Sequence, residues 1–127
     1  MSGRVAGKAA LITGGAQGLG EASVAVTDIN APGARAVADA INAAHPGQAF
    51  GYGHDVTDEV QWAEVVDRAT ADMGRLSVLV NNAGIGGDLR WLEDDSLDHW
   101  RKMQAINQES VMLRCKYAMP HLRAAAP

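Results

Sequence analysis

Short apolar runs alternate with longer segments of helical periodicity along this chain. Mostly apolar runs of strand length occupy residues 9–13, 24–28, 49–53 and 76–80, and the last is apolar at nearly every position. After the second run, each gap between runs carries apolar residues at three- and four-residue spacing. Strands that alternate with helices are typical of an α/β fold with a doubly wound parallel sheet. We therefore predict one such domain over residues 1–127, with four strands and flanking helices.

Capping residues and glycines mark the ends of three predicted helices. The first begins near Pro32 and ends at the "HPG" of residues 45–47. The second is capped by Asp58, with Gln61 three residues later, and Gly74 follows its end. The third begins at Ser96, and Pro120 kinks or ends it. Helical spacing predicts that these three helices bury, in order, Val37, Ala40, Ile41 and Ala44; Trp62, Val65, Val66, Ala69 and Met73; and Trp100, Met103, Ile106, Ser110, Leu113 and Tyr117.

The first predicted strand runs into a glycine-rich loop, "TGGAQGLG", at residues 13–20. Glycines let a backbone turn sharply and approach a pyrophosphate without a Cβ in the way. Taken alone this is weak evidence, because glycine-rich turns are common.

The connection after this loop is too short for the usual helix. Ten residues separate Thr13 from Val24, and the glycine loop takes seven of them. Two parallel strands need a crossover of a dozen or more residues, and three helical turns alone take about 11. We therefore expect the first crossover helix to be missing, and residues 20–23 are where a gap in the chain would lie.

Polar side chains follow three of the predicted strands. A carboxylate such as Asp28, at the end of the second strand, can accept hydrogen bonds from ribose hydroxyls, although a turn or a helix cap would also use it. Asp55 in "HDVTD" could meet an adenine amino group, or simply shape the turn before Asp58. "NNAG" at 81–84 suits a loop that braces neighbouring strands and a ribose. The carboxyl ends of parallel strands share one edge, so these loops should lie together.

Taken in order, these motifs resemble the short-chain dehydrogenase/reductase family. "TGGAQGLG" matches its cofactor loop, Asp28 its acidic residue for NAD preference, "DV" at 55–56 its adenine contact and "NNAG" its fourth-strand motif. "INQES" at 106–110 matches the helix whose catalytic asparagine holds a water in a proton relay, here Asn107. The resemblance implies a Rossmann-type fold that binds NAD through Gly14, Gln17, Gly18, Leu19, Gly20, Asp28, Asp55, Val56, Asn81, Ala83 and Gly84.

The same resemblance implies an oxidoreductase that transfers a hydride between NAD(H) and a secondary alcohol or ketone. It also implies a homodimer or homotetramer, with the helix at 96–119 against a neighbouring subunit. The family's catalytic Ser, and its Tyr and Lys four residues apart, have no match, because neither Tyr52 nor Tyr117 is followed by such a lysine. We therefore expect the 127-residue chain alone to be inactive. Either it is part of a longer dehydrogenase, which we favour, or it is a non-catalytic dinucleotide-binding or interaction module.

Composition narrows the alternatives. A net charge of −4, with scattered lysines and arginines, gives no basic patch for nucleic acid or an anionic membrane. The single cysteine, Cys115, indicates a reducing compartment, and no run has the length of a signal peptide or membrane span, so we expect a cytoplasmic protein.

The four histidines show no metal-ligand spacing, and we expect no metal site. Trp91 and Trp100 suit core or lid packing slightly better than a substrate mouth.

Overall fold

The computed structural model describes residues 6–13, 23–80 and 91–127, and strands alternate with helices in them. The elements are β1 (Ala9–Thr13), β2 (Ser23–Asp28), α1 (Ala31–Ala44), β3 (Ala49–Gly53), α2 (Glu59–Met73), β4 (Val78–Val80), the 3₁₀ turn η1 (Leu92–Asp94), α3 (Leu97–Gln104), the π-turn η2 (Ala105–Glu109) and α4 (Ser110–Ala125). The fourth strand is shorter than the predicted 76–80, although Leu76 just before it is fully buried.

The four strands form one parallel sheet in the order β3-β2-β1-β4. This order confirms the predicted doubly wound parallel sheet. From β1 the chain builds outward to β3 and then returns to β4 on the other side of β1, so the order reverses between β1 and β4. Residues 14–22 connect β1 to β2 and lie outside the described residues. Positions 20–22 of the predicted gap at 20–23 lie outside them too, whereas Ser23 begins β2.

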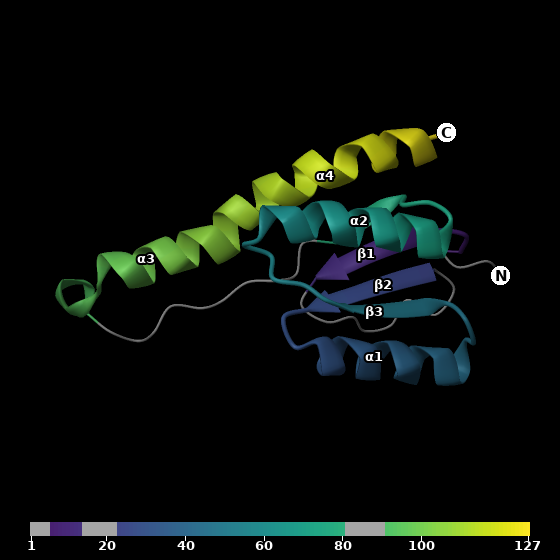
Figure 1. Ribbon diagram of the computed structural model, residues 1–127, viewed down its shortest axis with the longest axis horizontal. Coiled ribbons are helices and arrows are strands. Elements are labelled where there is room, and N and C mark those ends of the chain that lie inside the picture. The colour runs from purple at the N-terminus through teal and green to yellow at the C-terminus, as the bar shows by residue number, and fades with distance from the viewer. Residues whose placement is uncertain (1–5, 14–22, 81–90) are drawn as a thin grey trace.

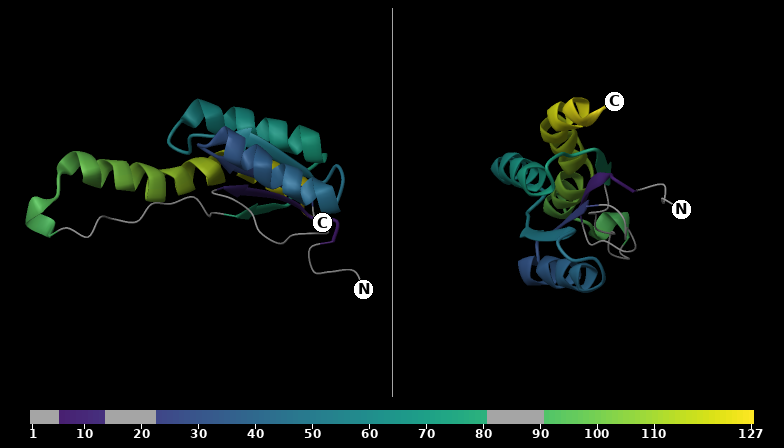
Figure 2. Two further views of the ribbon diagram at one scale, coloured as in Figure 1. Left: turned by 90° about the horizontal axis from the view of Figure 1, so that it is seen from below. Right: turned by 90° about the vertical axis from the view of Figure 1, so that its right-hand side faces the viewer.

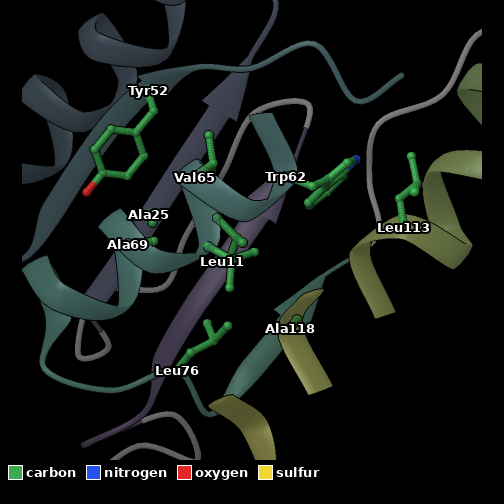
Figure 3. Close-up of a cluster of buried hydrophobic side chains, with 10 residues drawn as sticks. Leu11, Ala25, Tyr52, Trp62, Val65, Ala69, Leu76, Leu113 and Ala118 are labelled. Atoms are coloured by element: carbon green, nitrogen blue, oxygen red, sulfur yellow. The ribbon is translucent and has the colours of Figure 1, made fainter. Parts of the chain in front are cut away.

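Helices cover both faces of the sheet. Figure 1 shows α1 on one side, with α2 and α4 on the other, and the end-on view in Figure 2 separates these layers. A small core between α1 and the sheet contains Ala10, Ile12, Val24, Val26 and Ala34. The larger core lies beneath α2 and α4 (Figure 3) and includes Leu11, Ala25, Trp62, Val65, Val66, Ala69, Leu76, Leu113 and Ala118.

The ends of α2 are those that the sequence predicts. The Asp58 carboxylate accepts hydrogen bonds from the backbone amides of Val60 and Gln61, at 3.0 and 3.2 Å. Gly74 ends the helix with φ +80°, a left-handed conformation that glycine adopts without strain. Four of the five positions predicted to be buried in α2 are buried, and Met73 packs at the edge of the same core.

The buried stripe of α1 differs from the prediction. Ala34 and Ala38 are buried, and Val37 and Ile41 pack against the small core that contains Ala34. Ala40 and Ala44 are exposed. Alanine is tolerated on either face of a helix, so the spacing of alanines says little about which face is buried. The close packing depends on Gly51 of β3, where a Cβ would lie 2.7 Å from the Ala34 carbonyl oxygen.

The predicted third helix is longer and less buried than expected. It continues through Pro120 to Ala125, so the proline does not end it. Among its predicted core positions, Ser110 and Leu113 are buried, but α3 buries no residue and projects beyond the sheet (Figure 2). Trp91 and Trp100 are 76% and 54% exposed, so the core-packing interpretation of both is wrong. No helix in the described part of the chain is long and apolar enough to cross a membrane.

Candidate functional site

The carboxyl ends of β2 and β3 bring Asp28, His54 and Asp55 together. Asp28 pairs with Gly53 across the two strands, and the backbone amide of His54 donates to the Asp28 carbonyl at 2.9 Å. The chain leaves β3 at this point, so Asp55 follows at the same edge. The structure therefore places two predicted site carboxylates at neighbouring strand ends, as the sequence predicts.

Asp28 shapes the turn into α1 and keeps part of its carboxylate available. Its Oδ1 accepts a hydrogen bond from the Asn30 amide at 2.9 Å, and the Asn30 side chain in turn caps the helix at Gly33. No hydrogen bond from a described residue reaches its other oxygen. The turn interpretation is thus correct for one oxygen, and the second can accept a ligand hydroxyl.

Asp55 is held in the same way by Thr57. Its Oδ1 accepts from the Thr57 amide at 2.9 Å and from the Thr57 hydroxyl at 2.7 Å, and these two bonds lower the pKa of the carboxyl group. Its own amide donates to Oε1 of Gln61 at 2.8 Å. Asp55 is therefore an ionised and oriented acceptor at neutral pH.

Val56 is turned toward the protein interior. Its side chain packs at the edge of the larger core, and its carbonyl accepts a hydrogen bond from the indole nitrogen of Trp62 at 2.8 Å. This bond ties the loop after β3 to the first turns of α2. Val56 therefore fixes the backbone next to Asp55.

Sequence reasoning missed a buried polar group directly behind these carboxylates. His54 is 2% exposed, its Nδ1 lies 3.3 Å from the Thr27 hydroxyl, and its ring meets Trp62 edge-on with centroids 4.1 Å apart. Burial lowers the pKa of His54 to about 4, with Arg114 acting in the same direction. Its Nε2 is buried and has no hydrogen-bond partner among the described residues. The only signal of this buried polar group in the sequence was Thr27, a polar residue that lies inside an apolar strand, two positions after Ala25.

Asn107 lies in η2, where five residues form a π-turn between α3 and α4. Such turns are rare and often occur at functional sites. The side chain is exposed, and the junction of α3 and α4 lies on the side toward which the strands point (Figure 1). The turn that carries the candidate catalytic asparagine therefore lies toward the carboxyl ends of the strands, the end of the sheet where Asp28 and Asp55 lie.

The other predicted site residues fall outside the described part of the chain. They are Gly14, Gln17, Gly18, Leu19, Gly20, Asn81, Ala83 and Gly84. Both tyrosines make contacts of their own: the Tyr52 hydroxyl bonds Asp72, and the Tyr117 hydroxyl bonds Glu59 at 2.8 Å. Among the described residues no group of three or more His, Cys, Asp or Glu could hold a metal ion.

The sequence pattern of the short chain dehydrogenases matches residues 8–126. The chain belongs to this family. It is 40% identical over 135 positions to a 2,5-dichloro-2,5-cyclohexadiene-1,4-diol dehydrogenase of Sphingobium indicum, covering 96% of this chain and 52% of that protein. It is 38% identical over 133 positions to a 3-alpha-(or 20-beta)-hydroxysteroid dehydrogenase of Mycobacterium tuberculosis, covering 98% of this chain and 50% of that one.

Solved structures of short-chain dehydrogenases and reductases share this fold. A 3-ketoacyl-(acyl-carrier-protein) reductase from Brucella melitensis complexed with NADH superimposes with a TM-score of 0.85 at 29% identity, over 94% of this chain and 52% of that one. A 7α-hydroxysteroid dehydrogenase complexed with NADH and 7-oxo glycochenodeoxycholic acid gives a TM-score of 0.85 at 33% identity, over 95% of this chain and 50% of that one.

The chain spans about half the length of the curated relatives that it matches. The alignment with the Sphingobium protein runs over 135 positions and covers 96% of the 127 residues, about 122 of them, so about 13 positions (135 against 122) have no counterpart here.

Proposed function

We propose that this chain forms the NAD-binding part of a dehydrogenase that transfers a hydride between a secondary alcohol or ketone and NAD(H). The observation that carries the proposal is the pair of carboxylates, Asp28 and Asp55, at adjacent strand ends beside the reversal of strand order. Open α/β sheets bind their ligands at that place. The names of the relatives, which include a cyclohexadienediol and a hydroxysteroid dehydrogenase, support this substrate class.

The described residues fit the adenosine half of the cofactor. The second oxygen of Asp28 can accept a hydrogen bond from a ribose hydroxyl, and its charge disfavours a 2′-phosphate at the same position. The oxygen of Asp55 that Thr57 does not use can accept from an adenine amino group. Glycines at 14–20 and the residues Asn81, Ala83 and Gly84 complete the proposed site. Bound NAD would supply the hydride acceptor, a chemistry that protein side chains lack.

Asn107 has the proposed role of holding a water molecule in the path of the transferred proton. Its exposed position in a π-turn leaves the side chain accessible to such a water. We propose that the complete enzyme is a cytoplasmic homodimer or homotetramer. Leu97 and Trp100, exposed on α3, suit burial against a neighbouring subunit.

Cofactor preference tests this function. NADH and NADPH are titrated into the protein, and binding is followed by calorimetry. We expect NADH to bind more tightly than NADPH. We expect Asp28→Asn to weaken the binding of NADH by about tenfold, because hydrogen bonds to charged groups are stronger than those between neutral groups. The asparagine oxygen still accepts from the Asn30 amide, so the turn is preserved. Asp39→Asn, which removes an exposed carboxylate on α1, is the matched control. Equal affinities for both nucleotides in the parent protein would contradict the proposal.

A second candidate is a non-catalytic dinucleotide-binding module. It is favoured by the two tyrosines, because neither Tyr52 nor Tyr117 is followed by a lysine four residues later. Intact mass of the protein from its natural source separates the two candidates: a mass near 13.3 kDa favours the module, and about twice that value favours the enzyme. Turnover of NAD by the 127-residue chain alone would contradict our expectation that the missing Tyr and Lys are essential.

A further inference from the structure

A buried arginine lies beneath the π-turn. Arg114 of α4 is 1% exposed, although arginine is rarely buried without a charged partner. No carboxylate of a described residue forms an ion pair with it, and burial lowers the pKa of its guanidinium. Arginine nevertheless keeps its proton in proteins. The Arg114 guanidinium also lies 5.7 Å from the centroid of the Trp62 ring. A buried cation without an ion pair among the described residues is costly, so its contacts merit a functional explanation.

Both described hydrogen bonds of Arg114 go to one residue, Ser110. Its Nε donates to the Ser110 carbonyl at 3.2 Å, and its Nη2 donates to the Ser110 hydroxyl oxygen at 3.0 Å. Arginine has no acceptor, and a serine hydroxyl has a single proton. The Ser110 hydroxyl must therefore accept from Arg114 and direct its own proton elsewhere. That proton goes to the Ile106 carbonyl, 2.5 Å away.

The π-turn changes which group of Ser110 bonds the Ile106 carbonyl. In an α-helix the amide of Ser110 would donate to the carbonyl four residues earlier, which is that of Ile106. Here the amide instead reaches the Ala105 carbonyl, five residues earlier. The Ser110 hydroxyl, and not the Ser110 amide, therefore bonds the Ile106 carbonyl. A chain of two side-chain hydrogen bonds thus runs from Arg114 to the residue preceding Asn107.

We propose that Arg114 is a positioning residue for Asn107. Its guanidinium fixes the direction of the Ser110 hydroxyl, the hydroxyl satisfies the Ile106 carbonyl, and the π-turn then holds the Asn107 side chain in one orientation. The importance of this arrangement for catalysis rests on the proposed function, in which Asn107 holds a water. The hydrogen-bond chain itself does not depend on that function.

Nuclear magnetic resonance of the full chain tests the proposal without any nucleotide. The readouts are amide hydrogen exchange at Ser110, the carbonyl carbon shift of Ile106 and the side-chain amide signals of Asn107. In Arg114→Met we expect Ser110 to exchange about tenfold faster, because a hydrogen bond to a charged group has been lost, and the Ile106 and Asn107 signals to move. Arg123→Met removes an exposed arginine from the same helix and should change none of them.

Two serine variants make the test independent of the folding of Arg114→Met. Ser110→Ala should move the same three signals, and Ser110→Thr, which keeps the hydroxyl, should restore them. If Ser110→Ala leaves the signals of Ile106 and Asn107 in place, the proposal is wrong. It is equally wrong if a folded Arg114→Met does so. Failure of NADH to bind would contradict the proposed function and leave this hydrogen-bond chain unaffected.

Discussion

Replacing His54 should change how the stability of the protein depends on pH. The ring is buried between Thr27 and Trp62, and burial lowers its pKa from 6.5 to about 4. Arg114 lowers this pKa further, whereas the charges of Asp55 and Asp58 oppose the shift. The folded protein therefore holds a neutral ring at a pH where the unfolded chain has already bound a proton.

The direction and size of the effect follow from this difference. The folded state resists protonation, so its stability is complete above about pH 6.5 and declines as the pH falls toward 4. At pH 5.5 the unfolded ring is mostly protonated and the folded ring is not. Since pH 5.5 lies one unit below the unfolded pKa, the free energy of unfolding at pH 5.5 should be about 1.4 kcal/mol lower than at pH 8.

Urea unfolding at pH 8 and pH 5.5 measures this loss. Tryptophan fluorescence is a suitable probe, because Trp62 is fully buried while Trp91 and Trp100 are exposed. We expect His54→Asn to remove about 1.4 kcal/mol of the decline between the two pH values, whatever its absolute stability. His45→Asn, which removes an exposed ring, should retain the parent pH dependence. An unchanged pH dependence in His54→Asn would refute the reasoning.

Two further predictions concern packing and capping. Asp58→Ala should lower the free energy of unfolding by about 1 kcal/mol, because the amides of Val60 and Gln61 lose their cap; an unchanged urea midpoint would contradict this. Gly51→Ala should cost about 1–3 kcal/mol in the same measurement, because the new methyl would lie 2.7 Å from the Ala34 carbonyl oxygen. A tolerated alanine there would mean that α1 can shift away from β3.

Local chemistry made much of the fold predictable. Asp58 and Gly74 defined α2, and the alternation of strands with helices indicated the parallel sheet. Helical spacing was less informative where side chains are small, as at Ala40 and Ala44 of α1. It also misplaced Trp100, because periodicity identifies an apolar face but not whether another element covers it.

The candidate site was predicted from residues at strand ends, and its supporting groups were not. Asp28 and Asp55 could be located because parallel strands bring their carboxyl ends to one edge. His54 and Arg114 depend on contacts with Trp62 and Ser110 that arise only after folding. The π-turn around Asn107 has no signature in apolar spacing, since a single inserted residue shifts that spacing only locally.

The sheet order also governs when β1 can be completed during synthesis. The Ala9 amide donates to the Ser77 hydroxyl at 2.9 Å although 68 positions separate them, and β4 pairs only with β1. A ribosome adds about 5–20 residues per second, so β1 waits roughly 3–14 s for its second neighbour. During that interval one edge of β1, which is an inner strand of the finished sheet, is open to other chains in the cell. Binding by a chaperone before residue 80 emerges would therefore protect the nascent protein at its most exposed stage.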